Sequence, residues 1–278
     1  MYVRVAQTVK EVREFLSHTN GTRGLVPTMG ALHAGHEQLM KIARTECDVL
    51  TVSIFVNPLQ FGPTEDYSRY PRALTADLAM CDRNGADLVF QPSVEEMYPL
   101  PQSTFVEVGR LSDHLCGKFR PGHFRGVATV VLKLLNIMRP DRAYFGEKDL
   151  QQLTIIRRMT ADLNLPIAIV GVPTVRESDG LALSSRNKYL SDDERRAAPL
   201  LHRALEEAVR RIHAGEGDPA KVRETGLAIL KNSPLIRVEY FEIVEPGELQ
   251  PVSEITGPVR IAAAIWLGAT RLIDNASS

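Results

Sequence analysis

"GLVPTMGALHAGH", residues 24–36, decides the fold and raises the first question about function. An apolar run ends at Thr28, a glycine-bearing turn follows, and a helical pattern continues from His36 to Glu46. When a strand leads through such a turn into a helix, the first N–H groups and the positive dipole end of the helix favour a phosphate. The stretch therefore predicts a nucleotide-binding α/β fold.

The glycine spacing of this stretch matches a P-loop, but its chemistry differs. Gly30 and Gly35 bracket four residues, and His36 and Glu37 stand where a P-loop has Lys and Ser or Thr. Without those two groups the turn cannot grip terminal phosphates or supply a magnesium hydroxyl. His33 and His36 leave three roles open: capping or surface histidines, metal ligands, and phosphate donors. Because no cluster of further metal ligands lies nearby in the sequence, we prefer the donor role.

The rest of residues 1–174 alternates short β-branched runs with helical patterns. Further strands are expected to end at Val56, Phe90, Phe145 and Val172. Further helices are expected over residues 74–84, 127–138 and 149–163. This alternation requires a parallel sheet with crossover helices. We therefore predict a Rossmann-like, doubly wound catalytic domain over residues 1–174.

The pattern changes after about Val175. Helices are expected over residues 191–215 and 219–231, the first opened by a capping-box spacing of Ser191 and Glu194 and kinked or restarted at Pro199. Strands are expected over residues 235–244, 259–268 and 269–274. Helices followed by strands predict a smaller, lid-like α+β domain over residues 175–278.

Composition excludes several classes of protein. The 278 residues carry 33 Lys and Arg against 34 Asp and Glu, so the net charge of −1 offers no overall attraction to nucleic acid or an anionic membrane. No apolar run approaches the ~18 residues of a membrane span. Cys47, Cys81 and Cys116 are odd in number and widely spaced, which is typical of reduced thiols. We expect a cytoplasmic protein without nucleic-acid or membrane partners.

Polar segments follow the predicted strands, where ligands bind in such folds. Gln60 lies in NPLQF, Lys148 and Gln152 lie in GEKDLQQL, and Leu183–Arg186 form LSSR. Each segment alone is typical of solvated surface. Their combination with the opening turn favours a nucleotide site.

Six motifs occur in order over nearly the whole chain: PTMGALHAGH, SIFVNPLQF, YPR, GEKDLQQL, GVPTVRESDGLALSSRN and TRLIDN. Together they resemble the pantothenate synthetase (pantoate–β-alanine ligase) family of the nucleotidyltransferase superfamily, which is related in fold to class I aminoacyl-tRNA synthetases. His33 to His36 correspond to the His-x-Gly-His signature of that superfamily.

The resemblance implies a two-step reaction. ATP and (R)-pantoate form pantoyl adenylate and pyrophosphate, and β-alanine then displaces AMP to give pantothenate. The family also implies a requirement for Mg²⁺ and a homodimer. Two other functions stay open at this point: a nucleotidyltransferase with a different acceptor, and a catalytically silent nucleotide-binding or tRNA-related module.

The resemblance also implies the site residues. Those expected around ATP are Met29, Gly30, Ala31, Leu32, His33, Ala34, Gly35, His36, Gly146, Glu147, Lys148, Asp149, Val175, Leu183, Ser184, Ser185 and Arg186. Gln60 and Gln152 are expected to bind pantoate, and Gln60 also β-alanine. The expected catalytic residues are His36, His33 and Lys148, with His36 as the proton donor.

Further extensions of the resemblance concern metal and carboxylate binding. No side chain is assigned as a metal ligand, although Asp77 is expected near the metal. Arg120 and His123 are expected near a substrate carboxylate, with a solvated basic loop as an equal alternative. Leu150 and Leu183 depart from the family, since many members have an aromatic residue and Met there; both changes keep an apolar surface.

Overall fold

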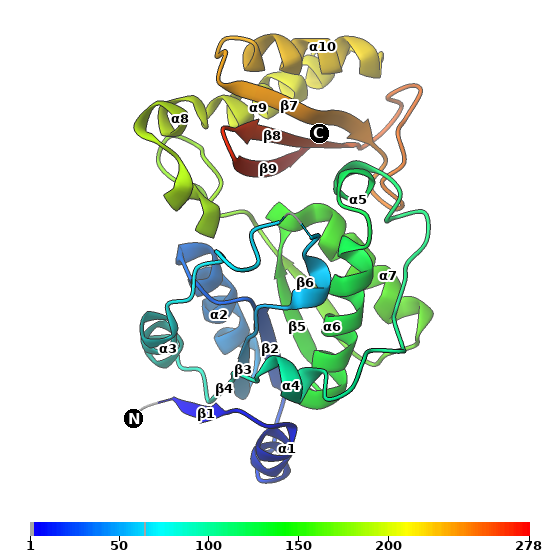
Figure 1. Ribbon diagram of the computed structural model, residues 1–278. Helices are drawn as coiled ribbons and strands as arrows, with labels where there is room; N and C mark the ends of the chain where they lie inside the picture. Colours follow the sequence, from blue (N-terminus) through cyan, green and yellow to red (C-terminus); the bar gives the residue numbers. More distant parts are fainter. Residues whose placement is uncertain (1–2, 64) are drawn as a thin grey trace. The chain divides into compact units, whose positions relative to one another are not determined.

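The computed structural model describes residues 3–63 and 65–278, which form two compact units (Figure 1). Unit 1 is made from the described parts of Met1–Gly109, Arg120–Glu147 and Ile155–Pro173. Unit 2 is made from Arg110–Phe119, Lys148–Thr154 and Thr174–Ser278. The last change of unit, after Pro173, lies beside the boundary expected after residue 174. That single boundary stays a prediction, because two earlier segments also belong to unit 2.

Unit 1 contains a six-stranded sheet with the order β1-β4-β3-β2-β5-β6, in which all neighbouring strands run parallel. The strands are β1 (Arg4–Ala6), β2 (Arg23–Thr28), β3 (Val49–Ile54), β4 (Leu88–Phe90), β5 (Arg142–Gly146) and β6 (Ala168–Val172). The order reverses beside β2, with β3 on one side and β5 on the other. Doubly wound sheets bind ligands at such a switch point. The predicted Rossmann-like sheet is confirmed.

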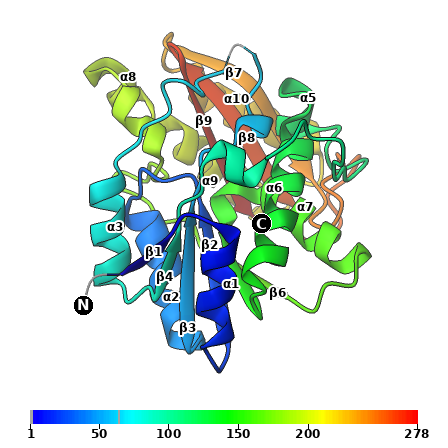
Figure 2. The ribbon, with the colours of Figure 1, turned by 60° about the horizontal axis from the view of Figure 1, so that its bottom comes forward.

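Helices cover both faces of this sheet (Figure 2). The helical elements are α1 (Val9–Ser17), α2 (Ala34–Glu46), η1 (Pro58–Gln60), α3 (Leu74–Arg83), α4 (Val94–Met97) and α6 (His123–Met138), followed by η2 (Glu147–Asp149) and α7 (Leu150–Asp162) where the chain changes unit. Helix α2 packs on β2, β3 and β5, whereas α1 and α6 pack together on the other face. Every residue of β3 is buried, which explains why its sequence is apolar or β-branched apart from Ser53.

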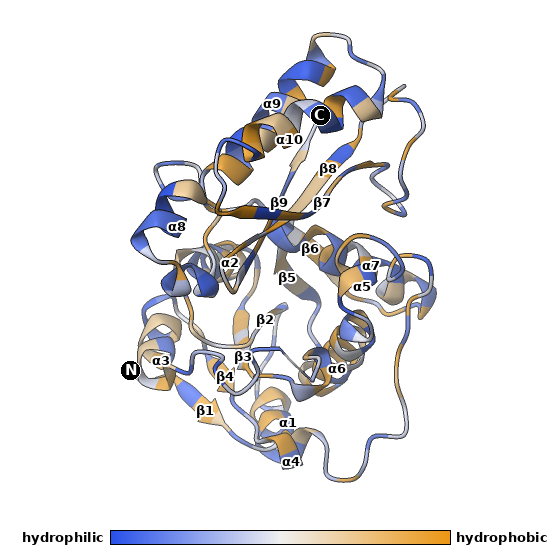
Figure 3. Cartoon of the chain, turned by 45° about the horizontal axis from the view of Figure 1, so that its top comes forward, coloured by the Kyte–Doolittle hydropathy of each residue, from blue (hydrophilic) through white to orange (hydrophobic). Residues whose placement is uncertain are grey.

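Unit 2 contains a three-stranded antiparallel sheet with the order β7-β8-β9. Its elements are α5 (Leu115–Phe119), η3 (Ser185–Tyr189), α8 (Asp192–Ala197), α9 (Leu200–His213), α10 (Pro219–Leu230), β7 (Ile236–Val244), β8 (Arg260–Leu267) and β9 (Thr270–Ser277). The core joins Leu201 and Leu205 of the amphipathic helix α9 to Phe241 and Ile265 of the sheet. Figure 3 shows hydrophobic and hydrophilic residues along α9. Pro199 is the N-cap of α9, so the expected restart of the helix there is confirmed.

Some elements differ from the sequence prediction. Helix α6 begins at His123 instead of Val127, so His123 and Arg125 lie on the helix and not in a loop before it. Elements β1, α4 and α5 have three to five residues, too few to show a periodic pattern. Helix α1 was also not predicted, although Thr8 and Glu11 form a capping box at its start. Across residues 3–63 and 65–278, no helix has both the length and the apolar character that a membrane span needs.

Candidate active site

The turn after β2 is held by a buried carboxylate. Asp77, on α3, accepts hydrogen bonds from the backbone N–H groups of Ala31 (2.9 Å) and Leu32 (2.8 Å). Gly30 has φ +81°, and a Cβ there would lie 3.0 Å from Asp77 Oδ2 and 3.1 Å from Ile54 Cγ2. Both the backbone angle and the close approach require glycine. Asp77, which the resemblance placed near a metal, thus fixes the shape of the turn.

His33 and His36 form a reciprocal cap at the start of α2. The backbone N–H of Gly35 donates to His33 Nδ1 (3.1 Å), and the backbone N–H of His33 donates to His36 Nδ1 (3.2 Å). Since a backbone N–H can only donate, both Nδ1 atoms are acceptors, and each neutral ring carries its proton on Nε2. The ring centroids lie 4.1 Å apart. The two histidines therefore combine the capping role with a pair of Nε2–H donors.

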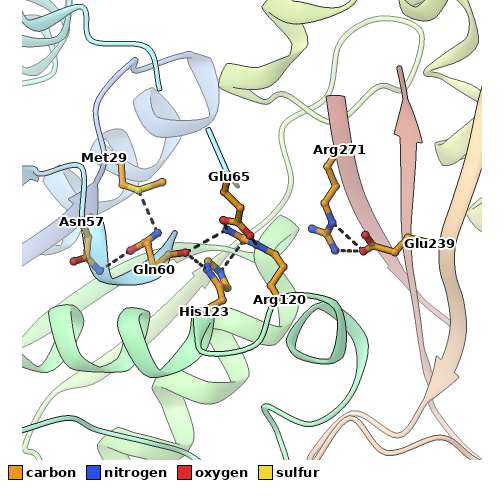
Figure 4. Close-up of polar contacts among 8 residues, drawn as sticks. All are labelled: Met29, Asn57, Gln60, Glu65, Arg120, His123, Glu239 and Arg271. Carbon is orange, nitrogen blue, oxygen red and sulfur yellow. Dashed lines mark hydrogen bonds and ion pairs between the residues drawn. The ribbon is translucent and has the colours of Figure 1, made fainter. Parts of the chain in front are cut away.

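Gln60 is held through its side chain by two residues, Asn57 and Met29 (Figure 4). Its Oε1 accepts from Asn57 Nδ2 (3.0 Å), and its Nε2 donates to Met29 Sδ (3.2 Å). Asn57 also donates to Gly126 O (3.2 Å) and accepts from the Tyr98 hydroxyl (2.8 Å). Burial raises the pKa of Tyr98, so its hydroxyl stays a donor. Because Asn57 presents an N–H to Gln60, the amide of Gln60 has one orientation, with its N–H toward Met29 in the turn after β2.

A second network holds the backbone of Gln60 (Figure 4). His123 Nδ1 lies 2.7 Å from Gln60 O, and Arg120 Nη1 lies 3.0 Å from His123 Nε2. Arginine only donates, so His123 accepts at Nε2 and donates from Nδ1. Arg120 also binds Glu65 through Nε (2.8 Å) and Nη2 (2.5 Å). The carboxylate that Arg120 holds in the structure is therefore that of Glu65.

The charge of Arg120 acts on Glu65. Burial raises the pKa of Glu65, but the hydrogen bond and positive charge of Arg120 lower it more, so the pKa lies below the ordinary value of 4.5. Glu65 stays ionised at neutral pH, and the pair keeps its charges. A substrate carboxylate could bind Arg120 only in competition with Glu65.

The remaining expected residues divide between the two units. Unit 1 holds Met29 to His36, Gln60, Gly146 and Glu147; unit 2 holds Lys148, Asp149, Gln152, Val175 and Leu183 to Arg186. In unit 2 the carbonyl O of Lys148 accepts a hydrogen bond from Asn275 Nδ2 (3.1 Å). Gln151 is buried and donates to Leu111 O (2.6 Å) and His114 O (2.7 Å). Successive helical residues point about 100° apart, so Gln152 points in a different direction from Gln151, and it is only partly buried.

The segment that carries LSSR begins as a short hairpin. The N–H of Leu183 donates to Val175 O (3.0 Å), and Arg176 pairs with Ala182 as an antiparallel bridge. Ser184 then caps η3 by accepting from the N–H of Arg186 (3.3 Å). Ser184 and Arg186 are partly exposed, whereas Ser185 is buried.

Metal binding has little support from side chains. In the part of the chain that the structure describes, residues 3–63 and 65–278, His, Cys, Asp and Glu form no group of three that could hold a metal ion. Both oxygens of Asp77 are engaged by backbone N–H groups. A magnesium ion bound to ATP needs no such cage, because phosphate oxygens and water supply most of its ligands.

Comparison with known proteins assigns the family. The model of the family described as Pantoate-beta-alanine ligase matches residues 4–277. The chain belongs to the pantoate–β-alanine ligase family. It is 52% identical over 275 residues to a pantothenate synthetase of Pelotomaculum thermopropionicum, with 98% of each chain covered.

Solved pantoate–β-alanine ligases share the fold over the whole length. A ligase from Thermus thermophilus is similar with a TM-score of 0.95 and 49% identity, covering 99% of both chains. A ligase from Francisella tularensis, complexed with beta-gamma ATP and beta-alanine, has a TM-score of 0.81 and 34% identity, covering 99% of this chain and 97% of that one.

The sequence did not assign roles to several residues that support this ligase site. Asn57 lies in the motif SIFVNPLQF, but the sequence does not predict its contact with Gln60. Tyr98 and Asn275 act across separations of 41 and 127 residues, and no local spacing reveals such contacts. The motif TRLIDN, which contains Asn275, was the available signal for that residue.

Proposed function

We propose that this ligase joins pantoate to β-alanine in two steps at the residues described above. The pantoate carboxylate attacks the α-phosphorus of ATP, forming pantoyl adenylate and releasing pyrophosphate. The amine of β-alanine then attacks the acyl carbon and displaces AMP. The single observation that carries the proposal is the paired cap of His33 and His36 at the N-terminus of the helix that follows the switch-point strand β2, in which both Nδ1 atoms accept backbone N–H groups and the ring protons lie on Nε2.

The histidines suit the first step electrostatically. Attack at phosphorus builds negative charge on the phosphate oxygens, and N–H donors that are already oriented stabilise it without reorganisation. His36 is proposed as the proton donor, with His33 beside it. Lys148, Ser184 and Arg186 are proposed to add donors for the phosphates.

The two glutamines suit the nucleophile. An Arg or Lys clamp would lower the reactivity of the pantoate carboxylate, whereas a neutral amide holds hydroxyl groups and leaves the carboxylate reactive. Gln60 is proposed to bind pantoate and β-alanine, and Gln152 to bind pantoate. The fixed amide of Gln60 supports this role, because its Nε2 group points only toward Met29 in the turn after β2.

Mg²⁺ is proposed to enter with ATP. The side chains of residues 3–63 and 65–278 offer it no three-ligand cage, which fits an ion held mainly by phosphate oxygens. When bound it would neutralise phosphate charge. The prediction is checked by adding a chelator, which should stop the reaction and leave the thermal unfolding of the ATP-free protein unchanged.

Self-association and location are further proposals. Residues 101–108 lie outside helices and strands, although Thr104 to Val108 read TFVEV, a β-favouring sequence with Phe105 36% exposed. A homodimer is proposed from the family resemblance, and sedimentation of wild type and Phe105→Asp would test whether this segment contributes to it.

The buried cysteines support the proposal of a reducing, cytoplasmic location. Burial and the charge of Asp77 raise the pKa of the Cys81 thiol to about 12, so this thiol stays protonated.

The decisive experiment is isotope exchange between pyrophosphate and ATP. Exchange should require pantoate, and adding β-alanine should yield pantothenate and AMP. Exchange that proceeds equally well without pantoate would contradict the proposal. A panel of other hydroxy acids tests a nucleotidyltransferase with a different acceptor.

A further inference from the structure

Two neighbouring side chains of β9, Asp274 and Asn275, are buried and polar. They expose only 3% and 7% of their surface. Successive residues of a strand point to opposite faces of the sheet, so the two side chains leave β9 in opposite directions. Each binds a segment of unit 2 that is proposed to contact ATP.

Asn275 supports the backbone at Lys148. Its Nδ2 donates to the carbonyl O of Lys148 at 3.1 Å. This bond fixes the peptide plane that follows Lys148, and the plane helps to set the direction in which the Lys148 side chain leaves η2. The donor comes from the strand farthest along the chain, 127 residues away.

Asp274 supports the hairpin that leads into LSSR. Its carboxylate accepts from Arg176 Nη1 (2.5 Å) and Nη2 (3.0 Å), a bidentate pair. Arg176 Nη1 also donates to Gly180 O (3.1 Å) across the hairpin. The N–H of Asn275 donates to Asp274 Oδ1 (2.8 Å), which ties the two supports together.

We propose that Asp274 and Asn275 are positioning residues that hold the Lys148 segment and the Leu183–Arg186 loop in one arrangement for ATP. The inference rests on the proposed ATP-binding role of those two segments. Strand β9 acts as a common reference for them, because its backbone is fixed by pairing with β8 along its full length. Loss of either support is expected to change the use of ATP more than the use of pantoate, because Gln60 lies in unit 1 and Gln152 lies on α7, beyond the peptide that Asn275 holds.

The test compares Asn275→Asp and Asn275→Ala with Asn232→Ala, an exposed asparagine of the same unit. Asn275→Asp keeps the shape but turns an oxygen toward the Lys148 carbonyl. Both Asn275 variants should lower kcat/KM for ATP by about 5- to 30-fold, as expected for a carbonyl that loses its buried donor. The KM for pantoate should stay within about twofold, and Asn232→Ala should behave as wild type.

Normal ATP parameters in folded Asn275 variants, or equal losses for ATP and pantoate, would overturn the inference. If the Asn275 variants do not fold, Arg176→Lys tests the other support, because it keeps the charge but loses the bidentate contact. Its kcat/KM for ATP should fall, and a wild-type value would overturn the inference. Lys148→Ala is measured alongside: wild-type ATP kinetics in that variant would instead refute the proposed ATP site.

Discussion

Gly126→Ala is predicted to impair the use of pantoate, although helix propensity alone predicts a more stable protein. Gly126 is buried in the first turn of α6. A Cβ there would collide with the carbonyl O of Leu59 and lie 2.5 Å from its carbon and 2.7 Å from the backbone N of Gln60. These are backbone atoms of η1, so no side-chain rotation can relieve the collision.

Two opposing contributions decide whether Gly126→Ala stabilises or destabilises the protein. Alanine in place of glycine stabilises a helix interior by about 1 kcal/mol, whereas overpacking a buried site costs about 1–3 kcal/mol. Restoring contact from 2.7 Å to 3.4 Å moves Gln60 by about 0.7 Å. A displacement of about 1 Å in a substrate-positioning group can cost roughly 10²-fold. We therefore expect kcat/KM for pantoate to fall about 10- to 100-fold, and the free energy of unfolding to fall by about 0–2 kcal/mol.

The assay measures steady-state AMP release with varied pantoate, together with denaturant unfolding. Gly226→Ala is the matched control, because Gly226 lies within helix α10 of unit 2 and a Cβ there would collide with the Phe241 ring. That variant should lose stability without changing the KM for pantoate. A folded Gly126→Ala protein with wild-type KM and kcat for pantoate would refute the reasoning.

Three other predictions concern single contacts. His36→Ala should slow pantoate-dependent exchange by roughly 10²-fold, and a near-normal rate would exclude its role as donor. Because the pKa of Glu65 is lowered in the fold, its pair with Arg120 stabilises the folded protein at neutral pH, and this contribution is lost as the pH falls through the folded-state pKa. Glu65→Gln should therefore lower the free energy of unfolding by about 1 kcal/mol at neutral pH and by almost nothing well below pH 4.5. Denaturant unfolding measured over this pH range would show the difference. Arg271→Met should cost about 3–5 kcal/mol, because the buried charge of Glu239 would lose its ion partner and keep only the hydrogen bond from Trp266 Nε1. Adding Glu239→Leu should restore part of that loss. Equal losses in urea unfolding of the single and double variants would contradict this.

The sequence predicted the strands of both sheets except β1, because their patterns are local. The strand ending at Thr28, the turn and the following helix appear as β2 and α2, since apolar periodicity and glycine position act over a few residues. The start of α6 was placed four residues late, because His123 and Arg125 are polar and stand before the apolar repeat. Phe124 and Gly126, which stand before the apolar repeat, are also buried in α6, so the helix extends beyond the repeat.

The candidate site was predictable only in part. The His33–His36 spacing marks the helix entry, and the resemblance supplied Gln60 and Lys148. The contacts that orient them come from residues distant in sequence, such as Tyr98 and Asn275. Such pairs depend on tertiary packing, so no pattern within a window of residues contains them.

The discontinuous make-up of unit 2 has a consequence in time. Ribosomes build the chain from its N-terminus, so β6 is finished about 100 residues before β9. At roughly 5–20 residues per second, the six-stranded sheet can be complete for about 5–20 s before Asn275 exists to hold Lys148. A nascent chain would thus acquire its sheet early and its full competence toward ATP last, with the final strand.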